Sequence, residues 1–169
     1  EGFALITQSD TVPGEDKWGA EPARPQFHFS QKVGWINDPN GMVYYKGEWH
    51  LYFQHNPVAL PWGGGNMTWG HAVSKDLVNW KQLPNVFHSR RTKSGKIDDM
   101  YSGGAVVDWK NTGGWKTGEN DVIVVTWTST GRGECVAYSN DKGRTFTEYE
   151  GNPVIPLEDG GRDPKPLWY

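Results

Sequence analysis

The stretch Ala72-Val73-Ser74-Lys75-Asp76, followed by Trp80, recurs 65 residues later as Ala137-Tyr138-Ser139-Asn140-Asp141, followed by Phe146. Each copy has the features of a β-strand, then a polar turn, then an aromatic residue that opens the next strand. Similarity at a fixed spacing is the signature of a repeated supersecondary unit. The two stretches therefore predict two copies of one β-unit.

Each copy extends to four expected strands, because short turns rich in Gly, Asp and Asn separate runs of β-forming residues. The strands are expected at residues 42–45, 49–54, 68–74 and 80–83, and then at 104–109, 122–128, 135–139 and 145–149. Four-stranded antiparallel sheets repeated along a chain are typical of the blades of a β-propeller, whose innermost strands surround one channel. The prediction is an all-β propeller.

Composition agrees with this fold class and excludes some functions. The 169 residues include 22 Gly and 11 Pro, and 14% are aromatic, which favours a turn-rich β-protein. The net charge is −3 and the basic residues form no run beyond Arg90-Arg91, so neither a nucleic acid nor a membrane is expected as a partner. A small neutral substrate fits better. The one cysteine leaves the redox compartment open.

Polar residues recur in phase with the units. Asp38 precedes the first strand of the first unit, Ser102 that of the second, and Asp163 a further expected strand at residues 165–169. Equivalent loops of a propeller converge on its channel, so these three side chains are expected to share one pocket. A β-sandwich is the alternative, and it would make the shared phase a coincidence.

The stretch Trp35-Ile36-Asn37-Asp38-Pro39-Asn40-Gly41 makes Asp38 a candidate nucleophile. Pro39 restricts Asp38 to extended geometry and the Asn-Gly pair favours a turn, which would fix the carboxylate at the entrance of a strand. Trp35 offers an apolar platform for a sugar ring and Asn37 a neutral hydrogen-bonding arm. A polar connecting loop with no function is the alternative.

Two carboxylates that converge in a neutral, Trp-rich funnel suit glycoside hydrolysis. Five ordered motifs across residues 26–169 together resemble glycoside hydrolase family 32, which contains invertases, inulinases, levanases and related fructosyltransferases. The motifs are Trp35 to Gly41, Tyr52-Phe53-Gln54-His55-Asn56-Pro57, Trp69-Gly70-His71-Ala72, Tyr101-Ser102-Gly103 and Gly161-Arg162-Asp163-Pro164.

The resemblance implies roles for these residues. Asp38 would attack the anomeric carbon of a β-fructofuranosyl unit, with retention of configuration, and Asp163 would stabilise the transition state. No metal and no cofactor are expected, and the partner is a fructose-containing oligo- or polysaccharide. The residues expected to bind substrate are Trp35, Asn37, Gln54, Trp62, Tyr101, Ser102 and Arg162.

Two further motifs are expected to carry no catalysis. Residues 139–146 resemble the Asp-box of sialidases, which is a hairpin device of propeller blades. Glu134-Cys135 imitates the pair that supplies the family's acid/base, but here it precedes the Arg162-Asp163 motif instead of following it. Its place at the start of a third strand, away from the innermost one, also argues against that role.

The expected organisation is an N-terminal arm at residues 1–25 and a partial propeller at 26–169, with blade one at about 38–88, blade two at about 100–156 and the start of blade three at 163–169. The family has five blades, so the chain is expected to be a fragment that lacks the acid/base and is inactive without the remaining propeller. A non-catalytic carbohydrate-binding or assembly module is the alternative. Extracellular or periplasmic localisation is expected; sucrose, inulin and levan remain open as substrates.

Overall fold

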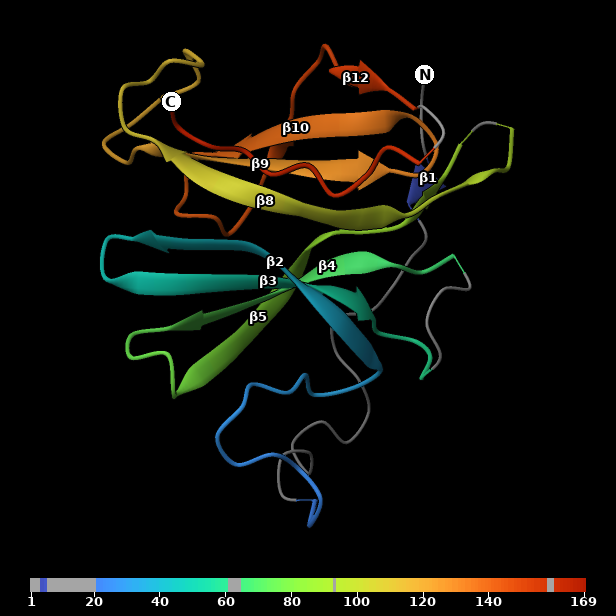
Figure 1. Cartoon of the computed structure of the whole chain (residues 1–169), viewed down its shortest axis with the longest axis vertical. Coiled ribbons are helices and arrows are strands. Elements are labelled where there is room, and N and C mark those ends of the chain that lie inside the picture. The colour runs from blue at the N-terminus through green and yellow to red at the C-terminus, as the bar shows by residue number, and fades with distance from the viewer. Residues whose placement is uncertain (1–3, 6–20, 61–64, 93, 158–159) are drawn as a thin grey trace.

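The computed structural model describes residues 4–5, 21–60, 65–92, 94–157 and 160–169, and every regular element in these ranges is a strand. None of the described residues forms a helix long and apolar enough to cross a membrane. Two larger antiparallel sheets dominate the molecule (Figure 1). The prediction of an all-β chain built from two repeated sheets is confirmed.

The first sheet has the strand order β2-β3-β4-β5 and the second has the order β11-β10-β9-β8, with β12 also paired to β10. Its strands are β2 (Trp35–Tyr45), β3 (Glu48–Asn56), β4 (Thr68–Ser74) and β5 (Trp80–Phe87). Those of the second are β8 (Met100–Asp108), β9 (Val122–Ser129), β10 (Gly133–Ser139), β11 (Thr147–Glu148) and β12 (Ile155–Pro156). Consecutive strands pair, as in a propeller blade.

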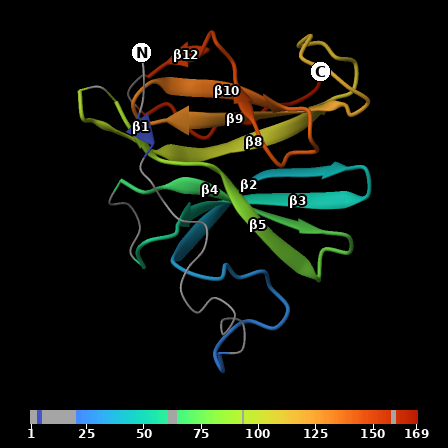
Figure 2. The same cartoon turned by 180° about the vertical axis from the view of Figure 1, so that it is seen from behind.

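An aromatic core joins the two sheets, which lie one above the other in both views, with β8 next to β2 (Figures 1 and 2). Trp69 of the first sheet and Trp127 of the second are fully buried in one cluster. The ring of Phe87 stacks on that of Trp127 with 4.8 Å between centroids. Buried aromatic residues contribute large apolar areas to stability, so this core fixes how the first strands of the two sheets meet.

Strand β2 differs from the sequence prediction. Residues 35–41 were expected as a turn ahead of a strand, but they belong to β2, whose register shifts between Ile36 and Pro39 and again between Asn40 and Val43. Pro39 has no N–H to donate, and Gly41 has a φ of +50°, so the strand bulges here instead of ending. Asp38 therefore lies inside a bulged strand.

The expected strand at residues 165–169 is also wrong. These residues form no strand but run against the second sheet, where the Trp168 Nε1–H donates to the carbonyl oxygen of Val107 at 2.8 Å. Pro164 and Pro166 lack the N–H groups that a sheet ladder needs. The segment is held to β8 and β9 through side chains.

The connection between the two sheets forms a small sheet of its own, with the order β1-β6-β7. Its strands are β1 (Ala4–Leu5), β6 (Arg90–Arg91) and β7 (Ile97–Asp98). Part of the predicted N-terminal arm is thus paired with the connection between the units.

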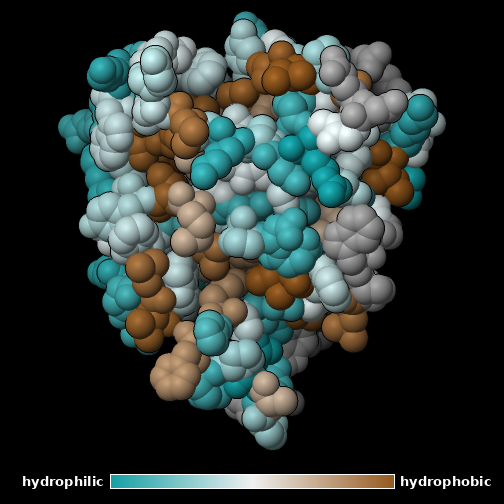
Figure 3. All heavy atoms as spheres, in the orientation of Figure 1, coloured by the Kyte–Doolittle hydropathy of each residue, from teal (hydrophilic) through white to brown (hydrophobic). Residues whose placement is uncertain are grey.

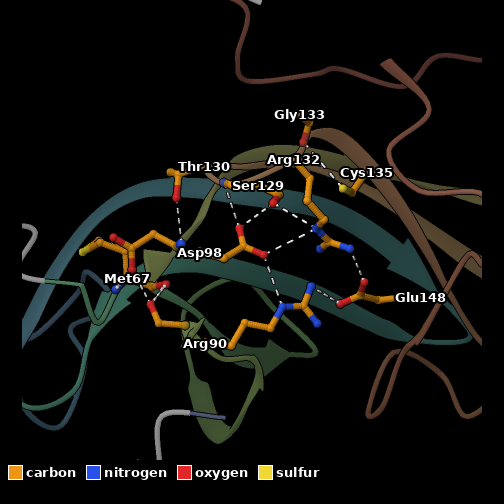
Figure 4. A network of polar contacts seen from close by, with 12 residues as sticks. Met67, Arg90, Asp98, Ser129, Thr130, Arg132, Gly133, Cys135 and Glu148 are labelled. Atoms are coloured by element: carbon orange, nitrogen blue, oxygen red, sulfur yellow. Dashed lines mark hydrogen bonds and ion pairs between the residues drawn. The ribbon is translucent and has the colours of Figure 1, made fainter. Parts of the chain in front are cut away.

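Buried charges fasten this connection to the second sheet (Figure 4). Asp98 has no exposed surface, and its Oδ2 lies 3.3 Å from Nε of Arg90 and 3.4 Å from Nε of Arg132. Both arginines also pair with Glu148, at 2.6 and 2.9 Å. Ser129 donates to the other oxygen of Asp98. Buried charges persist where they are paired in this way.

Two buried histidines lie within the first sheet. His50 Nδ1 and His71 Nε2 are 3.1 Å apart, and the His71 ring stacks on Tyr52 with 4.4 Å between centroids. The pKa of His50 is lowered to about 4, chiefly by burial and to a smaller extent by the charge of Arg144, while Glu48 opposes the shift. Burial and the neighbouring His50 also lower the pKa of His71. The folded protein therefore keeps this pair neutral.

We expect the protein to lose stability as the pH falls below about 6.5. Below that pH, His50 and His71 bind protons in the unfolded chain but not in the folded one. Each histidine therefore lowers the free energy of unfolding by at most about 1.4 kcal/mol per pH unit. For His50 the loss should continue down to a pH of about 4. Urea unfolding at pH 7, 5.5 and 4.5 measures it. The double variant His50→Gln/His71→Gln should show a shallower dependence, whereas the exposed-site control His28→Gln should not; equal slopes in all three proteins would contradict the assignment.

Candidate active site

A cleft of about 440 Å³ opens where the two sheets meet. It is lined by residues 38–42 of β2, 102–105 of β8 and the segment 163–166. Asp38, Ser102 and Asp163 all line it, so the structure brings together the three side chains that the repeat spacing placed in one pocket. Figure 3 shows hydrophilic residues gathered at the middle of one face, with apolar patches around them.

Asp38 is held as a carboxylate by neighbouring donors. The Ser102 hydroxyl donates to Asp38 Oδ2 at 2.8 Å, and this bond is the main reason why the pKa of Asp38 is lowered. A hydrogen bond from Asn37 and the charge of Arg162 lower the pKa too, while partial burial opposes them. The Trp35 Nε1–H donates to Asn37 Oδ1 at 2.8 Å, which leaves the Asn37 amide nitrogen to face Asp38.

Asp163 enters the cleft from the segment that crosses the second sheet. Its backbone has a φ of +60°, a left-handed conformation that is uncommon outside glycine. Its N–H donates to Thr128 Oγ1 of β9 at 2.9 Å. The Arg162 guanidinium Nε lies 3.6 Å from Asp163 Oδ2, and both side chains are more than half exposed. The carboxylate is thus accessible to a ligand.

Two glycines of β8 that line the cleft allow neighbouring segments to pack closely against this strand. A Cβ on Gly103 would lie 1.8 Å from the carbonyl oxygen of Thr126, and a Cβ on Gly104 would lie 2.5 Å from Cδ of Pro166. The Gly103 N–H donates to Asn40 Oδ1 of β2 at 3.4 Å. The geometry of the cleft therefore requires residues without a side chain at positions 103 and 104.

Of the other residues predicted to bind substrate, those that the structure describes do not line the cleft. Gln54 is buried, and its Nε2 donates to the carbonyl oxygen of Met100 at 2.8 Å, which ties β3 to β8. Tyr101 is half-buried, and its carbonyl accepts the indole N–H of Trp69. Trp35, Asn37 and Arg162 also lie outside the lining: Trp35 bonds to Asn37, while Asn37 and the charge of Arg162 influence Asp38. Trp62 lies outside the described residues.

The structure adds residues that the sequence analysis did not select. Lys165 lines the cleft, which its place two residues after Asp163 would have suggested. Glu134 lies on the third strand, as predicted, yet its carboxylate accepts the hydroxyl of Thr128, the residue that holds Asp163. In the described part of the chain, no group of three His, Cys, Asp or Glu residues is arranged to hold a metal ion.

The chain is similar to known proteins over nearly all of its length. The model for the glycosyl hydrolases family 32 N-terminal domain matches residues 28–169. A levanase of Bacillus subtilis is 51% identical over 98% of this chain and 24% of its own length, and invertase 2 of Saccharomyces cerevisiae is 44% identical over 86% and 28%. The chain thus spans about a quarter of the length of these curated relatives.

Solved structures agree with the fold. The crystal structure of an exo-inulinase from Aspergillus awamori superposes with a TM-score of 0.78 at 34% identity, covering 89% of this chain and 34% of that one. A β-fructofuranosidase from Schwanniomyces occidentalis, solved with fructosyl-erythritol, superposes with a TM-score of 0.74 at 39% identity over 86% and 29%.

Replacing Ser102 with alanine should raise the pKa of Asp38 toward its ordinary value, because the main bond to the ionised form is lost. NMR titration of the Asp38 carboxyl carbon measures the change. Ser94→Ala, on an exposed loop, should leave it unaltered. An unchanged Asp38 titration in Ser102→Ala would show that the hydroxyl does not stabilise the carboxylate.

Proposed function

The chain belongs to glycosyl hydrolase family 32, and on that premise we propose that it supplies the nucleophile and the transition-state stabiliser of a retaining β-fructofuranosidase. The observation that carries the proposal is the shared cleft of Asp38 and Asp163, in which Ser102 keeps Asp38 ionised. Retaining glycoside hydrolysis requires an ionised carboxylate as its nucleophile, which is the state that Ser102 favours for Asp38.

In the proposed mechanism, Asp38 attacks the anomeric carbon of a β-fructofuranosyl unit while the acid/base, which we assign below to the part of the relatives that this chain does not span, donates a proton to the leaving oxygen. The bond to the leaving group breaks and a fructosyl ester of Asp38 forms. Water, which gives a proton back to the same acid/base, then attacks the same carbon and releases Asp38, so two inversions give net retention. The exposure of Asp38 at the cleft wall leaves its carboxylate free to approach the sugar.

Asp163 would stabilise the positive charge that develops on the sugar and bind its hydroxyls. Arg162, whose Nε lies 3.6 Å from Asp163 Oδ2, would pair with that carboxylate, and its positive charge would help to keep Asp38 ionised at working pH. Asn37 and Ser102 would orient Asp38, while Gln54 would support β8 from within the core. Trp35, Trp62 and Tyr101 remain proposed sugar contacts.

We assign the acid/base to the part of the relatives' length that this chain does not span. Glu134 is engaged with Thr128 and is not proposed for that role. By this assignment the 169 residues alone would be inactive, and the remaining propeller would be their partner.

The substrate class is proposed to be fructose-containing sugars of the sucrose, inulin or levan type, since the relatives are a levanase, invertases and exo-inulinases. Three exo-inulinases among the relatives are described as extracellular, which supports secretion. The proposed organisation keeps an arm at residues 1–25 and propeller blades at about 38–88 and 100–156, with a third beginning at 163–169.

In the natural full-length protein, Asp38→Asn should reduce kcat for fructose release by roughly 10⁴-fold or more, because an amide cannot form the ester. Binding of a β-fructofuranoside should change little, since Asn keeps the shape of Asp. Fructose release measures the first and calorimetric titration the second.

Asp121→Asn is the matched control, because Asp121 pairs with Lys116 on an outer turn. It should retain full activity. Substantial turnover by Asp38→Asn, or a product that first forms with inverted configuration, would contradict the proposed function.

A further inference from the structure

Two threonines of β9 form hydrogen bonds to the segment that carries Asp163. Thr126 and Thr128 are two residues apart, so they point to the same face of the strand. Thr126 Oγ1 donates to the carbonyl oxygen of Pro164 at 3.1 Å, and Thr128 Oγ1 accepts the N–H of Asp163 at 2.9 Å. The Thr126 hydroxyl thus donates to the segment and the Thr128 hydroxyl accepts from it, and the two hydrogen bonds flank the peptide bond between residues 163 and 164.

Glu134 determines the direction of the Thr128 hydroxyl. Glu134 lies directly opposite Thr128 in the β9–β10 pairing, and Thr128 Oγ1 lies 2.9 and 3.1 Å from its two carboxylate oxygens. A hydroxyl has one proton and two lone pairs. Because that proton goes to the carboxylate, the lone pairs of Thr128 are directed to the Asp163 N–H.

These hydrogen bonds hold the backbone of Asp163 in an unusual conformation. A non-glycine residue at a φ of +60° persists only where its surroundings hold it. The segment 163–169 has no sheet pairing of its own, so the two threonine bonds are its main-chain anchors beside the cleft. Thr128 is buried, which strengthens its bonds by excluding water.

We propose that Glu134 and Thr128 form a positioning pair that fixes the backbone of Asp163 and so aims its carboxylate into the cleft. The catalytic consequence rests on the proposed function, whereas the structural one does not. Burial raises the pKa of Glu134 and so, to a smaller extent, does the charge of Asp163, which agrees with the closeness of the two carboxylates. Glu134 acts through Thr128 and does not itself contact the sugar.

Thr128→Val tests the pair in the natural full-length protein, since valine keeps the shape but removes the hydroxyl. We expect kcat/KM to fall by at least about 10-fold, chiefly in kcat, because a misplaced stabiliser weakens the transition state more than the ground state. Thr128→Ser restores the hydroxyl and should recover most of the loss. The control Thr147→Val, at an exposed site on β11, should retain wild-type kinetics.

Glu134→Leu separates positioning from packing. Alone, it should reduce kcat/KM, and Glu134→Gln, which keeps an acceptor for the hydroxyl, should recover part of the loss. Combined with Thr128→Val, it should add little, since no hydroxyl remains to be oriented. Fully additive losses would indicate separate structural roles and would overturn the proposal.

A crystal structure of Thr128→Val supplies a readout that needs no turnover. Departure of residue 163 from its left-handed conformation supports the pair. An unmoved Asp163, or a kcat/KM within twofold of wild type, overturns it. Asp38→Asn distinguishes the two ideas, because its inactivity upholds the proposed function even where the Thr128 variant is fully active.

Discussion

Contact between the first strands of two stacked sheets is the constraint on which the candidate site depends. The aromatic core around Trp69 and Trp127 sets the distance between the sheets, and β2 and β8 meet along its edge. Gln54 of β3 and Asn40 of β2 then bridge the two sheets with hydrogen bonds to the backbone of Met100 and Gly103 of β8. Asp38 and Ser102 are 64 residues apart in the sequence, and this contact between the sheets brings Ser102 Oγ to 2.8 Å from Asp38 Oδ2.

The carboxylates of Asp98 and Asp38 have different surroundings. Asp98 is fully buried and lies between two arginines, so its ion pairs stabilise the connection between the sheets. Asp38 is exposed and kept ionised mainly by one hydroxyl, with Arg162 as a weaker influence. A carboxylate that is stabilised but not enclosed by cations remains available to react. This contrast is the electrostatic reason for assigning chemistry to Asp38 and structure to Asp98.

Repeat spacing was sufficient to predict the two sheets and the meeting of Asp38, Ser102 and Asp163, because a fixed period places equivalent loops around one axis. It was not sufficient for the bulges of β2, since Asn40-Gly41 favours a turn and a bulge alike. Burial of Gln54 and the link from Glu134 to Asp163 depend on which residues face each other across strands. That register follows from three-dimensional packing, which no local motif records.

The central claim is that Asp38 forms a covalent bond to the sugar, and trapping that intermediate tests it most directly. The natural full-length protein would be quenched in acid during turnover of a β-fructofuranoside, digested and analysed by mass spectrometry. A fructosyl adduct on the peptide that contains Asp38, and its absence in Asp38→Asn, is the result that the account predicts. An adduct on Asp163 would contradict it.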